Sequence, residues 1–174
     1  MELLKVYPNI IYSDIDTVWL QDPRPYFMGN FNIWAQLDGV MTAAPIAKGY
    51  LPYFCTGFMA MRNSNSTIAI LQEWISELQH LKENDQWVFN RMVFENNFNV
   101  RSLPILKFPY GEFYFDKMPS SARNDVVVIH NNWILGRMEK IQRFIKHNLW
   151  FENIEGIFAI PIQNTIQIQI VIIR

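Results

Sequence analysis

The sequence predicts an α/β domain with a mostly parallel central sheet flanked by helices. Short apolar segments alternate along the chain with segments whose apolar residues recur every three or four positions, which indicates that strands alternate with helices. Several apolar segments have no polar face, as is typical of strands covered on both sides in a parallel sheet. Half of the 174 residues are hydrophobic, so the chain has enough apolar surface to bury a core.

The helices are expected from apolar spacing and from capping residues. Between Ile68 and Leu81 the apolar residues recur at spacings of three and four, and hydroxyl and amide side chains just before them supply caps. Pro8 ends a shorter helix at the start of the chain. The predicted helices cover residues 2–7, 68–81, 84–94 and 139–147.

The strands are expected where short apolar runs are bounded by turn residues. Residues 126–129 read Val-Val-Val-Ile, a β-branched run that predicts a buried strand. The predicted strands cover residues 10–12, 18–20, 32–36, 53–61, 100–103 and 126–129.

The composition excludes several classes of protein. Fifteen basic and 16 acidic residues give a net charge of −1, so we expect no nucleic-acid partner. A single cysteine excludes an internal disulfide framework and a cysteine-rich zinc module. No apolar run reaches the ~18 residues that a spanning helix needs, so we expect no membrane segment in this chain. The first residues are too few and too polar for a secretory signal.

Asp14 and Asp16 lie just past the C-terminal end of the first predicted strand. Ligands in open α/β sheets collect at the carboxyl ends of strands, and residues two apart on a continuing strand point to the same face. Two such carboxylates repel one another unless a cation or a basic side chain neutralises them. Oxygen ligands suit a hard divalent ion such as Mg²⁺ or Mn²⁺. A solvated acidic turn is the alternative interpretation of the same residues.

Six segments of the chain carry a family resemblance through their order. They are Tyr12–Pro23 with its Asp-x-Asp, Thr56–Arg62, Thr67–Trp74, Asn84–Asn90, Leu103–Gly111 and Val128–Lys140. Together they resemble the nucleotide-diphospho-sugar transferase family, GT-A-fold glycosyltransferases grouped with glycosyltransferase family 77. Six segments in the right order are far more specific than the Asp-x-Asp alone.

The resemblance implies a GT-A-like fold and a retaining transferase. Such an enzyme moves a sugar from a nucleotide diphosphate donor, UDP-linked by resemblance, to a hydroxyl of a glycan or protein acceptor. It also implies a divalent metal, Mn²⁺ or Mg²⁺, bound by Asp14, Asp16 and His130. In that picture Asp16 binds the metal directly, Asp14 contacts the metal or the donor, and His130 completes the shell. Taken alone, a histidine at a strand end such as His130 is more often a hydrogen-bonded structural residue than a metal ligand.

Other positions of the resemblance point to the donor. Lys140 at a helix start carries a charge for the diphosphate, and Gly136 permits close approach of the backbone. Asp38 and Trp133 are expected beside the donor.

The resemblance places catalysis at Asp85 and Gln86. These residues are expected on the first turn of their helix, facing the sugar and the acceptor, where a carboxylate stabilises an oxocarbenium-like centre. Cys55 departs from the family, which often carries asparagine there or next to it. We interpret Cys55 as a small core residue rather than a nucleophile.

The chain also differs from the family at its two ends. About 13 residues precede Asp14, where the GT-A fold has roughly 80 to 100 residues of Rossmann-like βαβ units that bind the base and ribose. We therefore expect an N-terminally truncated domain that lacks the nucleotide-binding part. We expect residues 1–150 to form this partial domain and residues 151–174 to form an extension. Residues 160–173 alternate isoleucine with polar residues, which predicts an edge strand or a poorly ordered tail.

Two other functions fit part of the sequence. Asp14 and Asp16 after an apolar strand also resemble the nucleophile loop of haloacid-dehalogenase-type phosphatases, with Asp14 as nucleophile. That interpretation leaves the His-Asn-Asn-Trp segment unexplained. An inactive or partner-dependent transferase fragment is the other alternative. By family resemblance the setting is the Golgi lumen or membrane, and this chain shows no signal or anchor.

Overall fold

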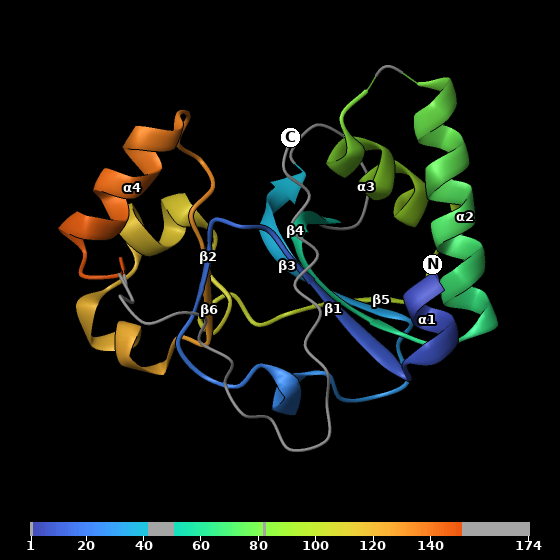
Figure 1. Ribbon diagram of the computed structural model, residues 1–174, viewed down its shortest axis with the longest axis horizontal. Coiled ribbons are helices and arrows are strands. Elements are labelled where there is room, and N and C mark those ends of the chain that lie inside the picture. The colour runs from blue at the N-terminus through green and yellow to red at the C-terminus, as the bar shows by residue number, and fades with distance from the viewer. Residues whose placement is uncertain (1, 42–50, 82, 151–174) are drawn as a thin grey trace.

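A four-stranded sheet lies at the centre of the computed structural model, which describes residues 2–41, 51–81 and 83–150 (Figure 1). Along the sheet the strands are β1 (Asn9–Ser13), β4 (Leu51–Arg62), β3 (Ile33–Met41) and β5 (Val100–Ser102). β1 and β3 both pair antiparallel with β4, whereas β5 pairs parallel with β3.

These strand directions correct the expectation of a mostly parallel sheet, because among the described strands only the β3–β5 pairing is parallel. Strands without a polar face indicate that both faces of the sheet are covered. A sheet can be covered on both faces whether its strands run parallel or antiparallel, so this pattern does not predict strand direction. Along β4, Met59 and Met61 lie in one apolar cluster, while Phe58 and Ala60 lie in another. Alternate side chains of the strand therefore both point into apolar surroundings.

Three helices cover one face of the sheet (Figure 1). They are α1 (Glu2–Val6), α2 (Asn65–His80) and α3 (Asp85–Asn96). Leu4, Ile70 and Phe89 from these helices belong to the same apolar cluster as Met59 of β4. Burial of this face against the sheet places the first turn of α3 beside the middle of β4.

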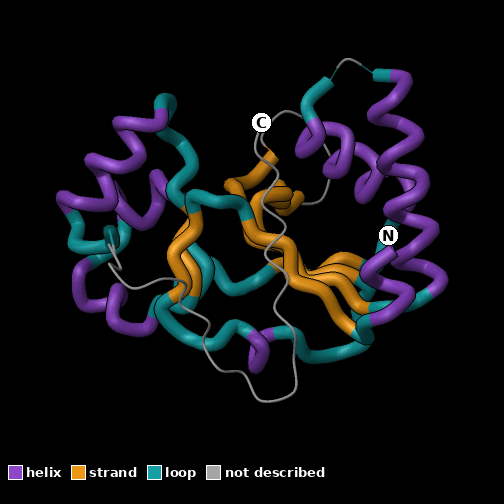
Figure 2. The backbone as a smooth tube through the Cα atoms, in the orientation of Figure 1, coloured by secondary structure: helices purple, strands orange, loops and turns teal. Residues whose placement is uncertain are grey.

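A two-stranded antiparallel ribbon lies on the other side of the sheet (Figure 2). It is formed by β2 (Thr17–Trp19) and β6 (Val128–His130), and α4 (Arg137–Lys146) follows it. Val128 shares an apolar cluster with Phe58 of the sheet, whereas its neighbour Ile129 shares one with Phe144 of α4. The ribbon is thus packed on both of its faces, and this packing holds its last paired residue, His130, in position.

Every helix and strand predicted within the described residues is present, with its ends displaced by a few residues. Three short helical turns were not predicted: Arg24–Tyr26, Phe113–Lys117 and Ser120–Asp125. The predicted edge strand at residues 160–173, and all of the predicted extension at 151–174, lie outside the described residues.

Candidate metal and donor site

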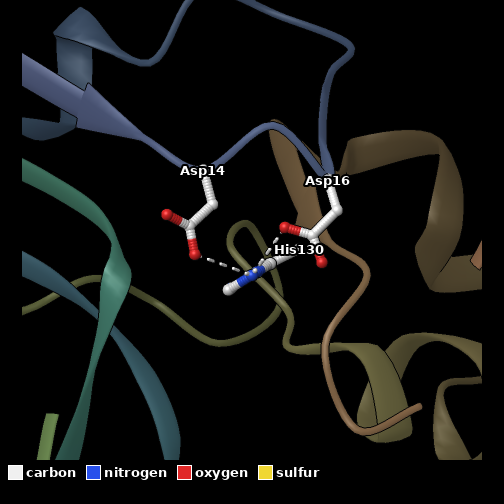
Figure 3. Close-up of side chains that lie close together, drawn as sticks. All are labelled: Asp14, Asp16 and His130. Atoms are coloured by element: carbon white, nitrogen blue, oxygen red, sulfur yellow. Dashed lines mark ion pairs between the residues drawn. The ribbon is translucent and has the colours of Figure 1, made fainter. Parts of the chain in front are cut away.

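Asp14 and Asp16 lie in the tight turn that joins β1 to β2. The pairing of β1 with β4 extends one residue past Ser13, because the Asp14 N–H donates to the Gly57 carbonyl at 2.7 Å. The Thr17 N–H and hydroxyl both donate to the Asp14 carbonyl, at 3.3 and 2.9 Å, and close the turn. A turn, rather than a continuing strand, therefore brings the two carboxylates to the same side (Figure 3).

His130 reaches the two acids through the β2–β6 ribbon. It is the last residue of β6 and lies opposite Thr17 in the register, and the next residue's N–H donates to the Asp16 carbonyl at 2.8 Å. Its Nε2 lies 3.3 Å from Oδ1 of Asp16 and 3.7 Å from Oδ2 of Asp14 (Figure 3). Three ligand-type side chains from two distant parts of the chain therefore meet at one point.

The chemistry and spacing of this group fit a divalent cation. One ligand atom from each of Asp14, Asp16 and His130 lies within 4.8 Å of the others. The exposed fraction of the side chain rises from 5% at His130 through 13% at Asp16 to 39% at Asp14, so the group opens to solvent on the Asp14 side. Two carboxylates and one imidazole are ligands that divalent cations accept. These residues can therefore hold such a cation, at a point that is open to solvent on the Asp14 side.

Lys140 is the basic side chain of the group. Its Nζ lies 2.5 Å from Oδ2 of Asp16. Burial by itself would raise the pKa of the Asp16 carboxyl, but hydrogen bonds and charges from His130 and Lys140 outweigh it and hold that pKa well below its usual range. Burial likewise would lower the pKa of His130, but Cys55 and Asp16 beside the ring raise it well above its usual value. The acids are thus partly neutralised within the protein.

Gly57 of β4 makes room for the group. A Cβ atom on this residue would lie 2.6 Å from Oδ2 of Asp14 and closer still to Cε1 of His130. Both distances are shorter than any real Cβ contact, so a side chain at position 57 would displace two of the three ligands. The strand can therefore approach the site only with glycine at this position.

A second polar group is centred on Asp38 of β3. Its Oδ1 accepts hydrogen bonds from Asn132 Nδ2 at 2.6 Å and Trp133 Nε1 at 2.7 Å, and its Oδ2 accepts one from Gln86 Nε2 at 2.8 Å. Trp133 has a left-handed backbone, with φ of 59°, and the residue is 59% exposed. The Asp38 carboxylate holds this exposed ring at the surface.

Asp85 joins the second group through Thr56. The Thr56 hydroxyl donates to Oδ2 of Asp85 at 3.3 Å, and its N–H donates to Oε1 of Gln86 at the same distance. Asp85 and Gln86 are the first two residues of α3, as expected.

Gly136 caps α4 with a positive φ of 96°, and its carbonyl accepts the N–H of Lys140 at 3.2 Å.

The structure thus gathers the predicted site residues into two groups and links them. Asp14, Asp16, His130 and Lys140 form the first, and Asp38, Asp85, Gln86 and Trp133 form the second. Cys55 bridges them, since its Sγ lies 3.2 Å from His130 Nδ1 and 3.9 Å from Asn132 Nδ2. Sequence reasoning missed the parts played by Gly57, Thr56 and Asn132, although all three lie inside the segments that carry the family resemblance.

Two solved structures with a similar fold are glycosyltransferases. The chain is similar to the WbbM bifunctional glycosyltransferase in its apo form, with a TM-score of 0.53 and 18% identity over 80% of this chain and 32% of that one. It is also similar to the glycosyltransferase GlyE of Streptococcus pneumoniae, with a TM-score of 0.50 and 14% identity over 90% and 48% of the two chains. At these identities the likeness shows the fold alone, which is GT-A.

Residues 1–144 match the nucleotide-diphospho-sugar transferase family, and the chain belongs to that family. UDP-D-xylose:L-fucose alpha-1,3-D-xylosyltransferase 3 of Arabidopsis thaliana is 28% identical over 86% of this chain and 44% of its own length. The MGP4 xylosyltransferase of the same plant is 31% identical over 86% and 47%. UDP-galactose:fucoside alpha-3-galactosyltransferase of Dictyostelium discoideum is 26% identical over 88% and 27%.

The family resemblance inferred from the six segments is therefore confirmed, and the comparisons do not favour the phosphatase interpretation. The chain spans less than half the length of these three curated relatives. Within the described residues, each helix is too short or too polar to cross a bilayer.

Proposed function

We propose that this chain carries the metal-binding and acceptor-side part of a glycosyltransferase that uses a UDP-sugar donor. The observation that carries the proposal is the convergence of Asp14, Asp16 and His130 within 4.8 Å in a member of the nucleotide-diphospho-sugar transferase family. The names of the relatives, which specify UDP-xylose or UDP-galactose, support the donor class.

The metal proposed here is a divalent cation, Mn²⁺ or Mg²⁺. When bound, it supplies Lewis-acid stabilisation of the nucleoside diphosphate that leaves as the glycosidic bond breaks. The chain contributes the ligands Asp14, Asp16 and His130. Lys140 adds a positive charge beside these ligands, where it would neutralise oxygens of the diphosphate. The Asp16 carboxylate holds the lysine ammonium group in place, with Nζ 2.5 Å from Oδ2.

The second group is proposed to bind the sugar and to take part in transfer. Asp38 and Trp133 offer a carboxylate and an exposed indole, which are groups that bind sugar hydroxyls and stack on sugar faces. Asp85 and Gln86 lie at the start of α3 beside Thr56, and we assign the stabilisation of an oxocarbenium-like centre to Asp85. Retention of the anomeric configuration, a glycan or protein hydroxyl as acceptor, and a Golgi setting remain proposals drawn from the family resemblance.

Metal binding and turnover of the donor test the proposal. We expect Mn²⁺ to bind the wild-type chain in calorimetry and Asp16→Asn to abolish that binding, whereas Asp22→Asn at the exposed Asp22–Arg24 pair serves as the matched control and binds normally. With Mn²⁺ present, turnover of a UDP-sugar supports the transferase. Turnover of phosphate monoesters alone would support a phosphatase. Metal binding without either reaction would identify an inactive or partner-dependent fragment.

Two further variants separate the proposed roles. Lys140→Met is expected to weaken binding of UDP while leaving an Mn²⁺ site intact, because the lysine would contact phosphate oxygens rather than the metal. Asp85→Asn is expected to lower kcat with little change in the KM for the donor, because its carboxylate is proposed to act on the transition state. Full turnover by Asp85→Asn would remove Asp85 from the catalytic role.

A further inference from the structure

Cys55 lies between the two groups of the site and is 1% exposed. Its Sγ is 3.2 Å from Nδ1 of His130, while Nε2 of the same ring faces Asp16 at 3.3 Å. The two ring nitrogens therefore have different partners, a sulfur on one side and the proposed cation site on the other. Because a neutral imidazole carries one proton, the partner of Nδ1 decides whether Nε2 has a lone pair to offer.

Two other N–H groups show in which direction the Cys55–His130 hydrogen bond runs. The Gly57 N–H donates to Sγ at 3.4 Å, and Nδ2 of Asn132 lies 3.9 Å from the same atom. A thiol is a weak donor, and a sulfur approached by two N–H groups is placed to accept. The consistent arrangement has a proton on Nδ1 of His130 that points at the sulfur. In the metal-free protein Nε2 also carries a proton, directed at Asp16, and a cation that replaces this proton meets the lone pair of Nε2.

We propose that Cys55 is a positioning residue that accepts the Nδ1–H of His130 and so presents Nε2 to a divalent cation bound by Asp14 and Asp16. The inference rests on the proposed function, since it concerns the same site. A metal-ligating histidine almost always donates its second N–H to a carboxylate, a backbone carbonyl or water. Here a buried sulfur takes that place, in the residue that sequence reasoning interpreted as core packing.

Three variants test this role through Mn²⁺ affinity measured by calorimetry. Cys55→Ala removes the acceptor, and loss of such a partner typically weakens metal binding about 10- to 100-fold. Cys55→Ser keeps an acceptor in a side chain of nearly the same size and is expected to bind much closer to wild type. Ile70→Val, which removes a methyl group from the cluster on the other face of the sheet, is the control and should bind normally.

Equal affinities of Cys55→Ala and wild type would overturn the positioning role. So would equal losses in Cys55→Ala and Cys55→Ser, because they would indicate that only packing matters. Absence of Mn²⁺ binding in wild type would instead overturn the proposed metal site itself.

The ring protonation is measured independently of any metal. Long-range ¹H–¹⁵N spectra of the metal-free protein, recorded across a pH series, are expected to show His130 protonated at Nδ1 throughout. The shift of Nδ1 should change more in Cys55→Ala than in Cys55→Ser. A neutral ring protonated at Nε2 alone would make the sulfur the donor and would overturn the inference.

Discussion

Gly57 lies so close to the site that the structure leaves no space for a side chain at this position. A Cβ atom there would contact both His130 and Asp14, and the neighbouring atoms belong to side chains held by their own hydrogen bonds. We expect Gly57→Ala to weaken Mn²⁺ binding by at least about tenfold, as loss of ligand orientation does. Calorimetry measures the affinity, and far-UV circular dichroism checks that the sheet is intact. A well-folded Gly57→Ala with wild-type affinity would contradict this account.

The ion pair between Asp16 and His130 makes the stability of the metal-free protein depend on pH in two directions. Asp16 has a folded-state pKa below its unfolded value, so its contribution is present above about pH 3.9 and is lost as the pH falls through the folded pKa. His130 has a raised folded-state pKa, so its contribution is complete below about pH 6.5 and is lost as the pH rises through the folded pKa. The metal-free protein should be most stable between these limits.

Asp16→Asn tests that pH dependence. Hydrogen bonds to charged groups contribute about 1.5–3 kcal/mol each, so the free energy of unfolding of the variant should be lower by that order near pH 6. It should also change less than that of the wild type as the pH falls or rises from there. Urea unfolding from pH 3 to pH 9 in the presence of a chelator measures the free energy of unfolding. Parallel curves for the wild type and the variant would show that the pair does not control the dependence.

Among the secondary-structure elements, α3 and β4 are joined by hydrogen bonds from a buried amide side chain, that of Asn90. Asn90 is 4% exposed, its Oδ1 accepts the Phe54 N–H at 2.7 Å, and its Nδ2 donates to the carbonyls of Phe54 and Gln86 at 2.7 and 2.8 Å. The same side chain therefore ties the helix to the strand and holds the first turn of α3. That turn carries Asp85 and Gln86, so the placement of the proposed catalytic pair depends on this contact.

Replacement of Asn90 should therefore affect both stability and the site. Asn90→Ala leaves buried backbone groups of Phe54 without partners and is expected to lower the free energy of unfolding by about 1–3 kcal/mol. Asn96→Ala, at an exposed position of the same helix, is the matched control and should change it by less than about 0.5 kcal/mol. Chemical denaturation of both variants measures the difference. Equal effects would show that the buried amide has no special role.

At the scale of the whole molecule, the proposed metal site joins the sheet to the ribbon. Asp14 follows a strand of the sheet, whereas Asp16 directly precedes β2 and His130 is the last residue of β6. A cation bound to all three would link these layers and would bind the folded chain in preference to the unfolded one. Such binding raises the free energy of unfolding by an amount set by the ratio of ligand concentration to dissociation constant.

We therefore expect divalent cations to stabilise the folded chain. Mn²⁺ at one hundred times its dissociation constant should raise the free energy of unfolding by about 2.7 kcal/mol. Thermal unfolding with and without Mn²⁺ measures the effect, and Asp22→Asn should keep it. Asp16→Asn should lose it, and the same rise in Asp16→Asn would place the cation elsewhere on the molecule.

The sequence alone was sufficient for the elements and for the candidate ligands. Helical spacing and apolar runs depend on neighbouring residues, so they located the helices and strands to within a few positions. Two motifs were recognisable in the sequence, the Asp-x-Asp of Asp14 and Asp16 and the segment around His130. Each is a short run of neighbouring residues, so its residue types and spacing can be read without the structure.

How these parts meet depends on contacts between segments that are distant in the sequence. Strand direction depends on which strands pair, and apolar runs do not encode it, so the antiparallel pairing of β4 was not foreseen. The ribbon register sets His130 beside Asp16, and a close approach to Gly57 leaves no space for a side chain. Cys55 looks like a core residue in sequence because its only distinctive feature, the histidine nitrogen against its sulfur, comes from a strand far along the chain.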